Sequence, residues 1–346
     1  MKKTTIHDIA RELNITFSTV ARALRDHPAI SEATKTAVRE MAEKLNYRQN
    51  KLASSLRSGN THIIGVIVPS LHVSFFSSVV HGIEKVMNEN GYSILLYQSN
   101  ELLQQEKKGI ATFLQSRVDG IISSITLETE DYRHYEEIKK RNIPLIFFDR
   151  DIAALDTPSV TIDDHQGGFI ATEHLIRQGY RRIVHITATQ PLPIFRERLR
   201  GYKDALLRYG IPVEETLILQ GEFSLEFGKA CVRRLREQGI PFDAVFALED
   251  YTAMGAIQQL QADGIAVPQE VGVIGFANES FGALVSPGLS TIDQQTVKMG
   301  EEAARLFLAT VRDKQHPPHK TVLQPMLIAR GSTDKMCGCA NVRMCR

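Results

Sequence analysis

The stretch from Thr5 to Arg57 constrains the fold most, because it predicts several short helices joined by tight turns. Thr5 is typical of a helix N-cap, and apolar residues follow it at helical spacing as far as Asn14, which tolerates a left-handed turn. Thr16 then predicts the start of a second helix, with Val20, Ala21 and Leu24 toward a core. The residues left facing outward are Phe17, Ser18, Thr19, Arg22 and Arg25. Two short helices, a tight turn and a small polar face with arginine suit a helix-turn-helix that enters a DNA major groove.

Two further helical patterns complete this stretch. One is capped by Ser31 and runs to about Leu45 with an apolar stripe along one side. The other is the short segment from Lys51 to Arg57. A helix of that length does not persist alone in water, so we expect it to need a partner helix, a DNA groove, or both.

Four elements of this stretch resemble the lactose-repressor/galactose-repressor (LacI/GalR) family of bacterial transcriptional regulators. They are T-I-x-D-I-A at 5–10, S-T-V-x-R-A-L at 18–24, L-N-Y at 45–47 and the hinge-helix run N-K-L-A-S-S-L-R at 50–57. The resemblance continues to about Ser332. It implies an all-α helix-turn-helix DNA-binding domain at 1–49 and a hinge helix with linker at 50–60.

From His62 onward, short apolar runs alternate with amphipathic helical patterns, and the alternation occurs in two similar halves. This pattern predicts doubly wound parallel sheets in two α/β lobes. The resemblance implies an effector-binding domain like the periplasmic sugar-binding proteins, with a cleft between the lobes. It assigns 61–162 and 293–322 to the first lobe and 163–292 and 323–334 to the second.

Charge and composition favour a protein that touches phosphates with one end only. Residues 1–60 hold 11 lysines and arginines against 6 acids, whereas the remainder holds 30 against 34; chance clustering is the alternative. No leader pattern or apolar run near the ~20 residues of a membrane span is visible. Four cysteines suit a reducing cytoplasm.

For the cysteine-containing end at 335–346 we favour a disordered tail over a metal or redox site, since no zinc spacing is present.

The DNA contacts follow from the polar face and the resemblance together. We expect Phe17, Ser18 and Arg22 to read base edges in the major groove. Leu56 of paired hinge helices would act as an apolar wedge in the minor groove. The residues expected mainly to hold phosphates are Thr5, Thr19, Ser31, Tyr47 and Asn50. A homodimer, or a higher oligomer, would present two heads to a pseudo-palindromic operator of double-stranded DNA.

Candidate effector-binding residues lie where predicted strands end, since the carboxyl ends of parallel strands offer polar groups to ligands. Phe75 and Phe76 follow the first strand and are candidates for stacking on a sugar ring or a base, with core packing as the alternative. Asp149 ends a later strand beside Arg150, where a plain surface ion pair is equally compatible.

Four more candidates come from the resemblance. Arg198 stands in the pattern R-x-x-G-[FY] of the family's ligand-binding arginine, although a solvated arginine on a helix would look the same. Asp250 matches a position that contacts ligand and is also an N-cap candidate. Phe223 is a stacking or core aromatic, and Gln294 matches a pocket or hinge glutamine.

One departure bears on the ligand. The family usually reads G-[FY]-D-[ND] after a strand of the second lobe, whereas this chain reads Gly275-Phe276-Ala277-Asn278. The acid that holds sugar hydroxyls is therefore replaced by Ala277, and Asn278 is left as the candidate polar group. A sugar or sugar derivative remains the expected effector.

No catalytic signature stands out: G-x-S-x-G, a P-loop, H-E-x-x-H and G-x-G-x-x-G do not occur. We therefore expect no enzyme, no cofactor and no metal, but a DNA-binding transcriptional regulator, most simply a repressor, under effector control. The sequence is compatible with an effector that releases the protein from DNA and with one that promotes DNA binding. The alternative is a cytoplasmic small-molecule-binding protein or sugar enzyme whose head serves only oligomerisation.

Overall fold

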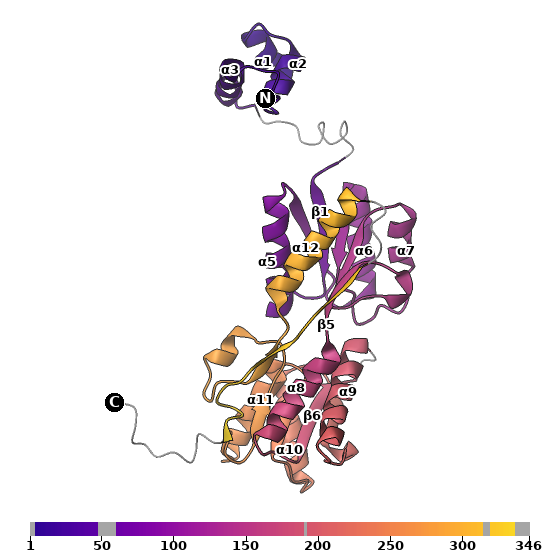
Figure 1. Cartoon of the computed structure of the whole chain (residues 1–346), viewed down its shortest axis with the longest axis vertical. Helices are drawn as coiled ribbons and strands as arrows, with labels where there is room; N and C mark the ends of the chain where they lie inside the picture. The colour runs from indigo at the N-terminus through magenta and orange to yellow at the C-terminus, as the bar shows by residue number, and fades with distance from the viewer. Residues whose placement is uncertain (1–3, 48–59, 190–191, 314–318, 336–346) are drawn as a thin grey trace, which may run out of the picture. The chain divides into compact units, whose positions relative to one another are not determined.

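The computed structural model describes residues 4–47, 60–189, 192–313 and 319–335 (Figure 1). The chain divides into two compact units, one up to Thr61 and one from His62 onward. The expected hinge helix, with Asn50 and Leu56, lies outside the described residues.

The first unit is a bundle of α1 (Ile6–Glu12), α2 (Phe17–Ala23) and α3 (Glu32–Lys44). The predicted caps form: the Thr5 backbone N–H donates to Asp8 at 2.8 Å, and the Thr16 and Ser31 hydroxyls accept backbone N–H groups three residues on. Asn14 ends α1 with a φ of 51°. Ala21, which was expected to face the core, is half-buried, and the fully buried residues of α2 are Val20 and Ala23.

The first lobe of the second unit has a six-stranded parallel sheet in the order β11-β5-β4-β3-β1-β2. Its strands are β1 (Ile63–Val68), β2 (Ser93–Gln98), β3 (Ile121–Ser123), β4 (Leu145–Phe148), β5 (Ser159–Ile162) and β11 (Lys320–Leu323). Helices α5 (Ser74–Glu89), α6 (Leu103–Ser116), α7 (Arg133–Lys140) and α12 (Thr296–Arg312) surround it, together with the 3₁₀ turn η1 (Ala153–Leu155). The continuous apolar strands follow from this burial on both faces.

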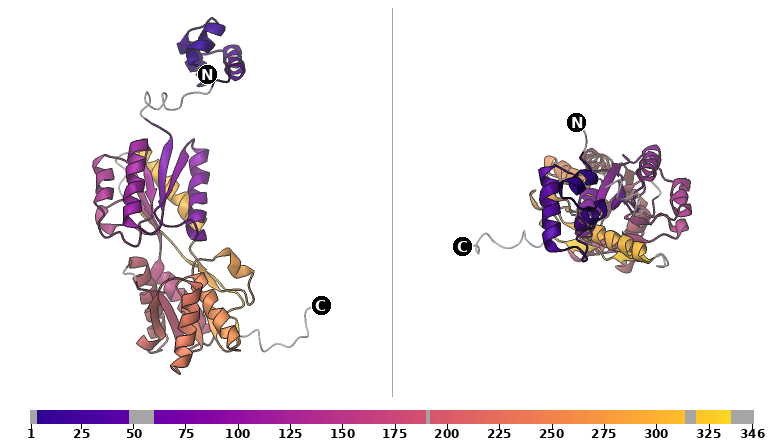
Figure 2. Two further views of the ribbon diagram at one scale, coloured as in Figure 1. Left: turned by 180° about the vertical axis from the view of Figure 1, so that it is seen from behind. Right: turned by 90° about the horizontal axis from the view of Figure 1, so that it is seen from above.

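The second lobe has a four-stranded parallel sheet in the order β7-β6-β8-β9. Its strands are β6 (Ile183–Ala188), β7 (Ile218–Gly221), β8 (Ala244–Ala247) and β9 (Gly272–Ile274). Its helices are α8 (Asp164–Arg177), α9 (Pro193–Arg208), α10 (Leu225–Glu237) and α11 (Asp250–Ala262), with the 3₁₀ turns η2 (Glu215–Leu217) and η3 (Ser280–Ala283). Seen from behind, helices flank both sheets (Figure 2), as the alternating pattern predicted.

The two lobes are joined by segments far apart in the sequence. The chain leaves the first lobe after β5, returns from β10 (Thr291–Asp293) into α12, and passes back from β11 to β12 (Met326–Ile328) (Figure 1). β10 and β12 pair antiparallel, so two of these segments support each other. Polar groups on them are thereby held where both lobes meet.

Close packing of α5 on α12 fixes the helix that returns from the second lobe. A Cβ added at Gly82 would lie 2.1 Å from the Val297 carbonyl oxygen, and one added at Gly300 would lie 2.0 Å from that of Val79. Neither helix can accept a methyl group there without moving.

We expect Gly300→Ala to lower the free energy of unfolding by about 1–3 kcal/mol, because the methyl group forces α12 away from α5. Denaturant unfolding of the full chain measures this. The control is Asn88→Ala, on the exposed side of α5, which should change stability by less than about 0.5 kcal/mol. Equal effects of the two variants would contradict the close approach.

Candidate functional site

The exposed side of α2 carries the residues expected to read DNA. Phe17, Ser18 and Arg22 are all exposed, and Phe17 leaves 54% of its surface open. Its ring packs against that of His7 on α1, with centroids 5.3 Å apart. An aromatic ring held in place and open to solvent suits contact with a partner. Sequence reasoning missed His7, whose partner lies on another helix.

The expected phosphate contacts are spread over the head and differ in how free they are. The hydroxyls of Ser18 and Thr19 lie 2.8 and 2.9 Å from that of Thr16, so both belong to the cap of α2. Thr5 and Ser31 also bond within their own first turns. Tyr47 is half-buried, and burial raises the pKa of its phenol. The hydroxyls of Thr5, Thr19 and Ser31 are thus positioned by the caps that start the helices.

A cavity of about 340 Å³ lies between the lobes of the second unit and is large enough for a small ligand. Six of the eight expected effector-binding residues line it: Phe75, Phe76, Asp149, Arg198, Phe223 and Gln294. Lining residues that the sequence did not single out include Glu101, Leu127, Glu249, Tyr251 and Glu279.

The aromatic residues of the cavity serve packing and lining together. Phe75 and Phe76 lie edge to face, with ring centroids 5.0 Å apart, and both belong to the buried core of their lobe. Phe223 is partly exposed and packs against Phe195 at 5.1 Å. The stacking and core interpretations of these rings are therefore not exclusive.

A charged group marks the first lobe's side of the cavity. The Arg150 Nη1 donates to both Glu101 carboxylate oxygens, at 2.9 and 3.1 Å, and the Arg150 Nε lies 3.5 Å from Asp149. Burial raises the pKa of Asp149, and Arg150 opposes that shift. Asp149 is thus part of a buried charge cluster rather than the plain surface ion pair.

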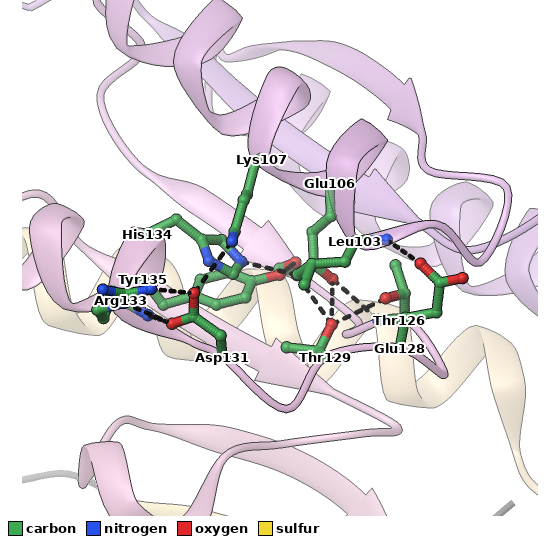
Figure 3. Close-up of polar contacts among 11 residues, drawn as sticks. Leu103, Glu106, Lys107, Thr126, Glu128, Thr129, Asp131, Arg133, His134 and Tyr135 are labelled. Atoms are coloured by element: carbon green, nitrogen blue, oxygen red, sulfur yellow. Dashed lines mark hydrogen bonds and ion pairs between the residues drawn. The ribbon is translucent and has the colours of Figure 1, made fainter.

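Carboxylates hold the loop after β3, and Figure 3 shows the contacts of one of them, Glu106. Leu127 of this loop lines the cavity. Glu106, fully buried on α6, accepts from the Thr126 backbone N–H at 2.9 Å and lies 2.7 Å from His134 Nε2. On the other side, Glu101 accepts from the Leu127 backbone N–H at 2.9 Å. This wall is rigidly supported before any ligand arrives.

Arg198 is committed to bonds within the protein. Its guanidinium donates to Asp164 at 2.8 Å, to the Leu248 carbonyl at 3.3 Å and to Gln294 at 3.2 Å. It also lies over the Phe276 ring, 3.7 Å from the centroid. Burial raises the pKa of Asp164 to about 6, although Arg198 opposes the shift. Arg198 therefore links α8, the end of β8 and the segment that returns to the first lobe.

Asp250 and Asn278 are not among the cavity's lining residues in the described part of the chain. Asp250 is fully buried and accepts from the Thr291 hydroxyl and the Glu279 backbone N–H, each at 2.7 Å. The alternative that it caps α11 is wrong, since the cap is Glu249, whose carboxylate accepts the Tyr251 and Thr252 N–H groups. Asn278 bonds to Arg330 and Asp293 instead.

Comparison with known proteins places these features in a family. Residues 5–50 match the family model of bacterial regulatory proteins, lacI family, and residues 172–333 match a periplasmic binding protein-like domain. The HTH-type transcriptional regulator DegA of Bacillus subtilis (strain 168) is 32% identical over 335 residues, which cover 96% of this chain and 99% of DegA. The chain belongs to the lacI family of bacterial regulatory proteins. This lacI-family member is a DNA-binding transcriptional regulator, as its motifs predicted.

Solved structures agree with the fold. The complex of the transcriptional regulator CelR with cellobiose has a TM-score of 0.72 at 27% identity, over 95% of this chain and 100% of CelR. The Lac repressor dimer bound to operator and an anti-inducer has a TM-score of 0.85 over 96% of this chain and 99% of its own. At 23% identity the second match speaks for the fold alone. The predicted fold class is confirmed.

The described residues of this regulator contain neither a candidate metal cluster nor a candidate membrane span. No cluster of three or more His, Cys, Asp or Glu residues there is arranged to hold a metal ion. None of the helices described combines the length and the apolar character that crossing a membrane requires.

We expect Arg198→Ala to destabilise the regulator by about 3–5 kcal/mol, because it leaves the Asp164 carboxylate buried without its partner. Calorimetry of the full chain measures the loss. The double variant Arg198→Met with Asp164→Asn removes the uncompensated charge and should recover part of the stability. If the single variant is as stable as the wild type, the buried pair has no such role.

Asp250 predicts a dependence of stability on pH. Burial, with Glu249 and Glu279 nearby, raises the pKa of Asp250 to about 7, above the ~4 of an unfolded chain. The folded protein then keeps a proton that the unfolded chain loses, so this contribution to stability is full below about pH 4 and is lost as pH rises through 7.

We expect Asp250→Asn to keep both hydrogen bonds without a buried charge, since an amide accepts from Glu279 N–H and donates to the Thr291 hydroxyl. The variant should melt at a higher temperature than wild type at pH 8, and the difference should shrink toward pH 4. A constant difference across this range would contradict the assignment.

Proposed function

We propose that a small effector, a sugar or sugar derivative, binds in the cavity between the lobes and controls the affinity of the regulator for its operator. The observation that carries this proposal is that both lobes line one cavity of about 340 Å³, with aromatic rings, carboxylates and arginines around it. Rings and hydrogen-bonding groups together suit a ligand with apolar faces and hydroxyl edges. The similar regulator CelR is solved with cellobiose.

The proposed effector contacts are the cavity-lining residues that the sequence nominated. Phe75, Phe76 and Phe223 supply faces for stacking, and Asp149 and Gln294 supply polar groups. Arg198 orients Gln294 and, when the lobes move, exchanges part of its bonding with the ligand. Asp250 and Asn278 support the site from behind. We assign 61–162 with 293–322 to one lobe, and 163–292 with 323–334 to the other.

We further propose that the regulator binds double-stranded operator DNA as a homodimer, with one head on each half-site. Phe17, Ser18 and Arg22 are exposed together on α2 and would read base edges, while Thr5, Thr19, Ser31 and Tyr47 would contact phosphates. The roles of Asn50 and Leu56 in the hinge remain proposals from the resemblance. The similar Lac repressor is solved as a dimer on its operator.

Effector binding would act by changing how the lobes are disposed about the three joining segments. These segments carry Gln294 and the bonds of Arg198, so a ligand there biases their arrangement. We propose that the chain has no enzymatic activity, because the similar DegA is named as a transcriptional regulator. We also propose that it acts in the cytoplasm, and at the nucleoid when it is bound to DNA.

A gel shift with duplexes selected from a random library tests the function directly. The regulator should bind a pseudo-palindromic site with a strong dependence on salt, and a sugar that raises its melting temperature should change that affinity at least about fivefold. Sugars that bind the protein but leave every DNA affinity unchanged would refute effector control.

We expect Arg22→Ala to relax base preference at one position of each half-site, at a cost of about 1–3 kcal/mol in discrimination. Selection from a random duplex library, followed by sequencing, measures the preference. Arg39→Ala is the control, since Arg39 lies on α3 and pairs with Asp26; it should leave the preference intact. Unchanged selectivity in Arg22→Ala would remove this residue from base reading.

A further inference from the structure

The loop after β9 carries an acidic residue into the cavity at a position the sequence comparison did not indicate. Ala277 stands where the family usually has an acid, but Glu279, two residues on, lines the same cavity with only 4% of its surface exposed. The backbone explains how. Ala277 has a φ of 121° and Asn278 a φ of 56°, so two successive residues turn the chain in the left-handed sense. Asn278 bonds to Arg330 on one side of the loop, and Glu279 lines the cavity.

The backbone of this loop is held at every step. The Ala277 N–H donates to the Ile292 carbonyl at 2.9 Å, and the Asn278 N–H donates to the Thr291 hydroxyl at 3.1 Å. The Glu279 N–H donates to the buried Asp250 carboxylate at 2.7 Å. The direction of the Glu279 side chain is therefore set by the strand β10 and by Asp250, not by chance on a free loop.

Glu279 is also the carboxylate of this wall that remains available. Among the described residues it has no ion pair with a lysine, arginine or histidine, whereas Arg150 and Arg198 are already bound to other carboxylates. The neighbouring Glu249 uses its oxygens to cap α11. One Glu279 oxygen accepts from the Ser74 hydroxyl at 2.5 Å, and Ser74 begins α5 in the other lobe. A buried carboxylate with a single neutral donor has capacity for further donors.

We propose that Glu279 is a specificity-determining residue of the effector cleft, which accepts hydrogen bonds from a donor group of the effector and joins the lobes through Ser74 when the cleft is empty. This inference rests on the proposed effector function of the cavity. The donor is a pair of hydroxyls or an ammonium group, because both present protons to a carboxylate. A phosphate or carboxylate of an effector at this wall is disfavoured, because Glu249 and Glu279 line it and neither has a cationic partner among the described residues.

The link to Ser74 couples recognition to the arrangement of the lobes. A ligand donor that takes the Glu279 oxygen competes with the Ser74 hydroxyl, which belongs to the opposite lobe. The contact between α5 and the loop after β9 is then exchanged for contacts through the ligand. The same Glu279 carboxylate would thus bind the ligand when it is present and Ser74 when the cleft is empty.

The first arm of the test needs no ligand and uses the full chain. Ser74→Ala and Glu279→Ala should each speed amide hydrogen exchange at the start of α5 and in η3, by about threefold or more. The double variant should exchange no faster than the faster single variant, because the two substitutions remove the same hydrogen bond. Glu226→Gln, an exposed glutamate of the same lobe paired with Lys229, is the control and should exchange like the wild type. Additive effects of the two variants would overturn the link.

The second arm uses sugars in matched sets that share a skeleton: glucose, glucosamine, glucose 6-phosphate and gluconate, with the corresponding galactose and ribose compounds and cellobiose. Titration calorimetry on the wild type should detect binding of a neutral or amino member and none of the phosphates or acids. Glu279→Gln, which keeps the shape, should weaken that binding about tenfold or more. A preference for the amino form that disappears in Glu279→Gln identifies ammonium, and equal loss for both forms identifies hydroxyls.

The outcomes separate the two proposals. Binding that is equal in wild type and Glu279→Gln, or binding of a phosphate or acid, overturns the role of Glu279 and leaves the effector cleft standing. If no member of any set binds the wild type, the carbohydrate effector fails, and the recognition role of Glu279 fails with it.

Discussion

The bonds of one buried guanidinium hold together the place where the two lobes meet. Arg198 reaches Asp164 at the start of α8, the carbonyl that follows β8, and Gln294 on the segment that enters α12. Each of these groups would be costly to leave unpaired in a buried site. Separating the lobes at this point therefore has to replace these hydrogen bonds. A ligand that offers Arg198 or its partners other bonds would therefore act on the place where the lobes meet.

The second lobe supports its side of the cavity with buried carboxyl groups that have no cationic partner among the described residues. Asp250 lies behind the cavity and fixes the backbone of Glu279, while Glu249 starts α11 one residue earlier. Three carboxyl groups thus share a small region without a cationic partner among the described residues, and burial raises the pKa of Asp250 to about 7. We expect such a region to discriminate among ligand groups by their charge. It favours neutral or cationic ligand groups and disfavours anions.

Much of the head and of the fold was predictable because it depends on local patterns. Caps at Thr5, Thr16 and Ser31 start helices through short-range hydrogen bonds, and the strand–helix alternation encodes a parallel sheet. The errors have equally specific causes. Ala23, which the prediction left out of the core, is fully buried, and the cap considered for Asp250 is made by Glu249. In both cases the correct residue is a close neighbour in sequence, which a pattern resolves poorly.

The sequence by itself determined the helix-turn-helix, the two α/β lobes, the membership of the family and six of the residues that line the cavity. It did so because caps, periodicity and motif spacing are local properties of the chain. Only the tertiary structure decided that the Arg198 guanidinium donates to Asp164 and Gln294, and that the Asp250 carboxylate accepts from the Glu279 backbone N–H. It also decided that Glu279 bonds to Ser74, 205 residues away in the sequence. These contacts join segments whose distance in space depends on how the chain crosses between the lobes. No local pattern records that distance, so only the folded chain could reveal it.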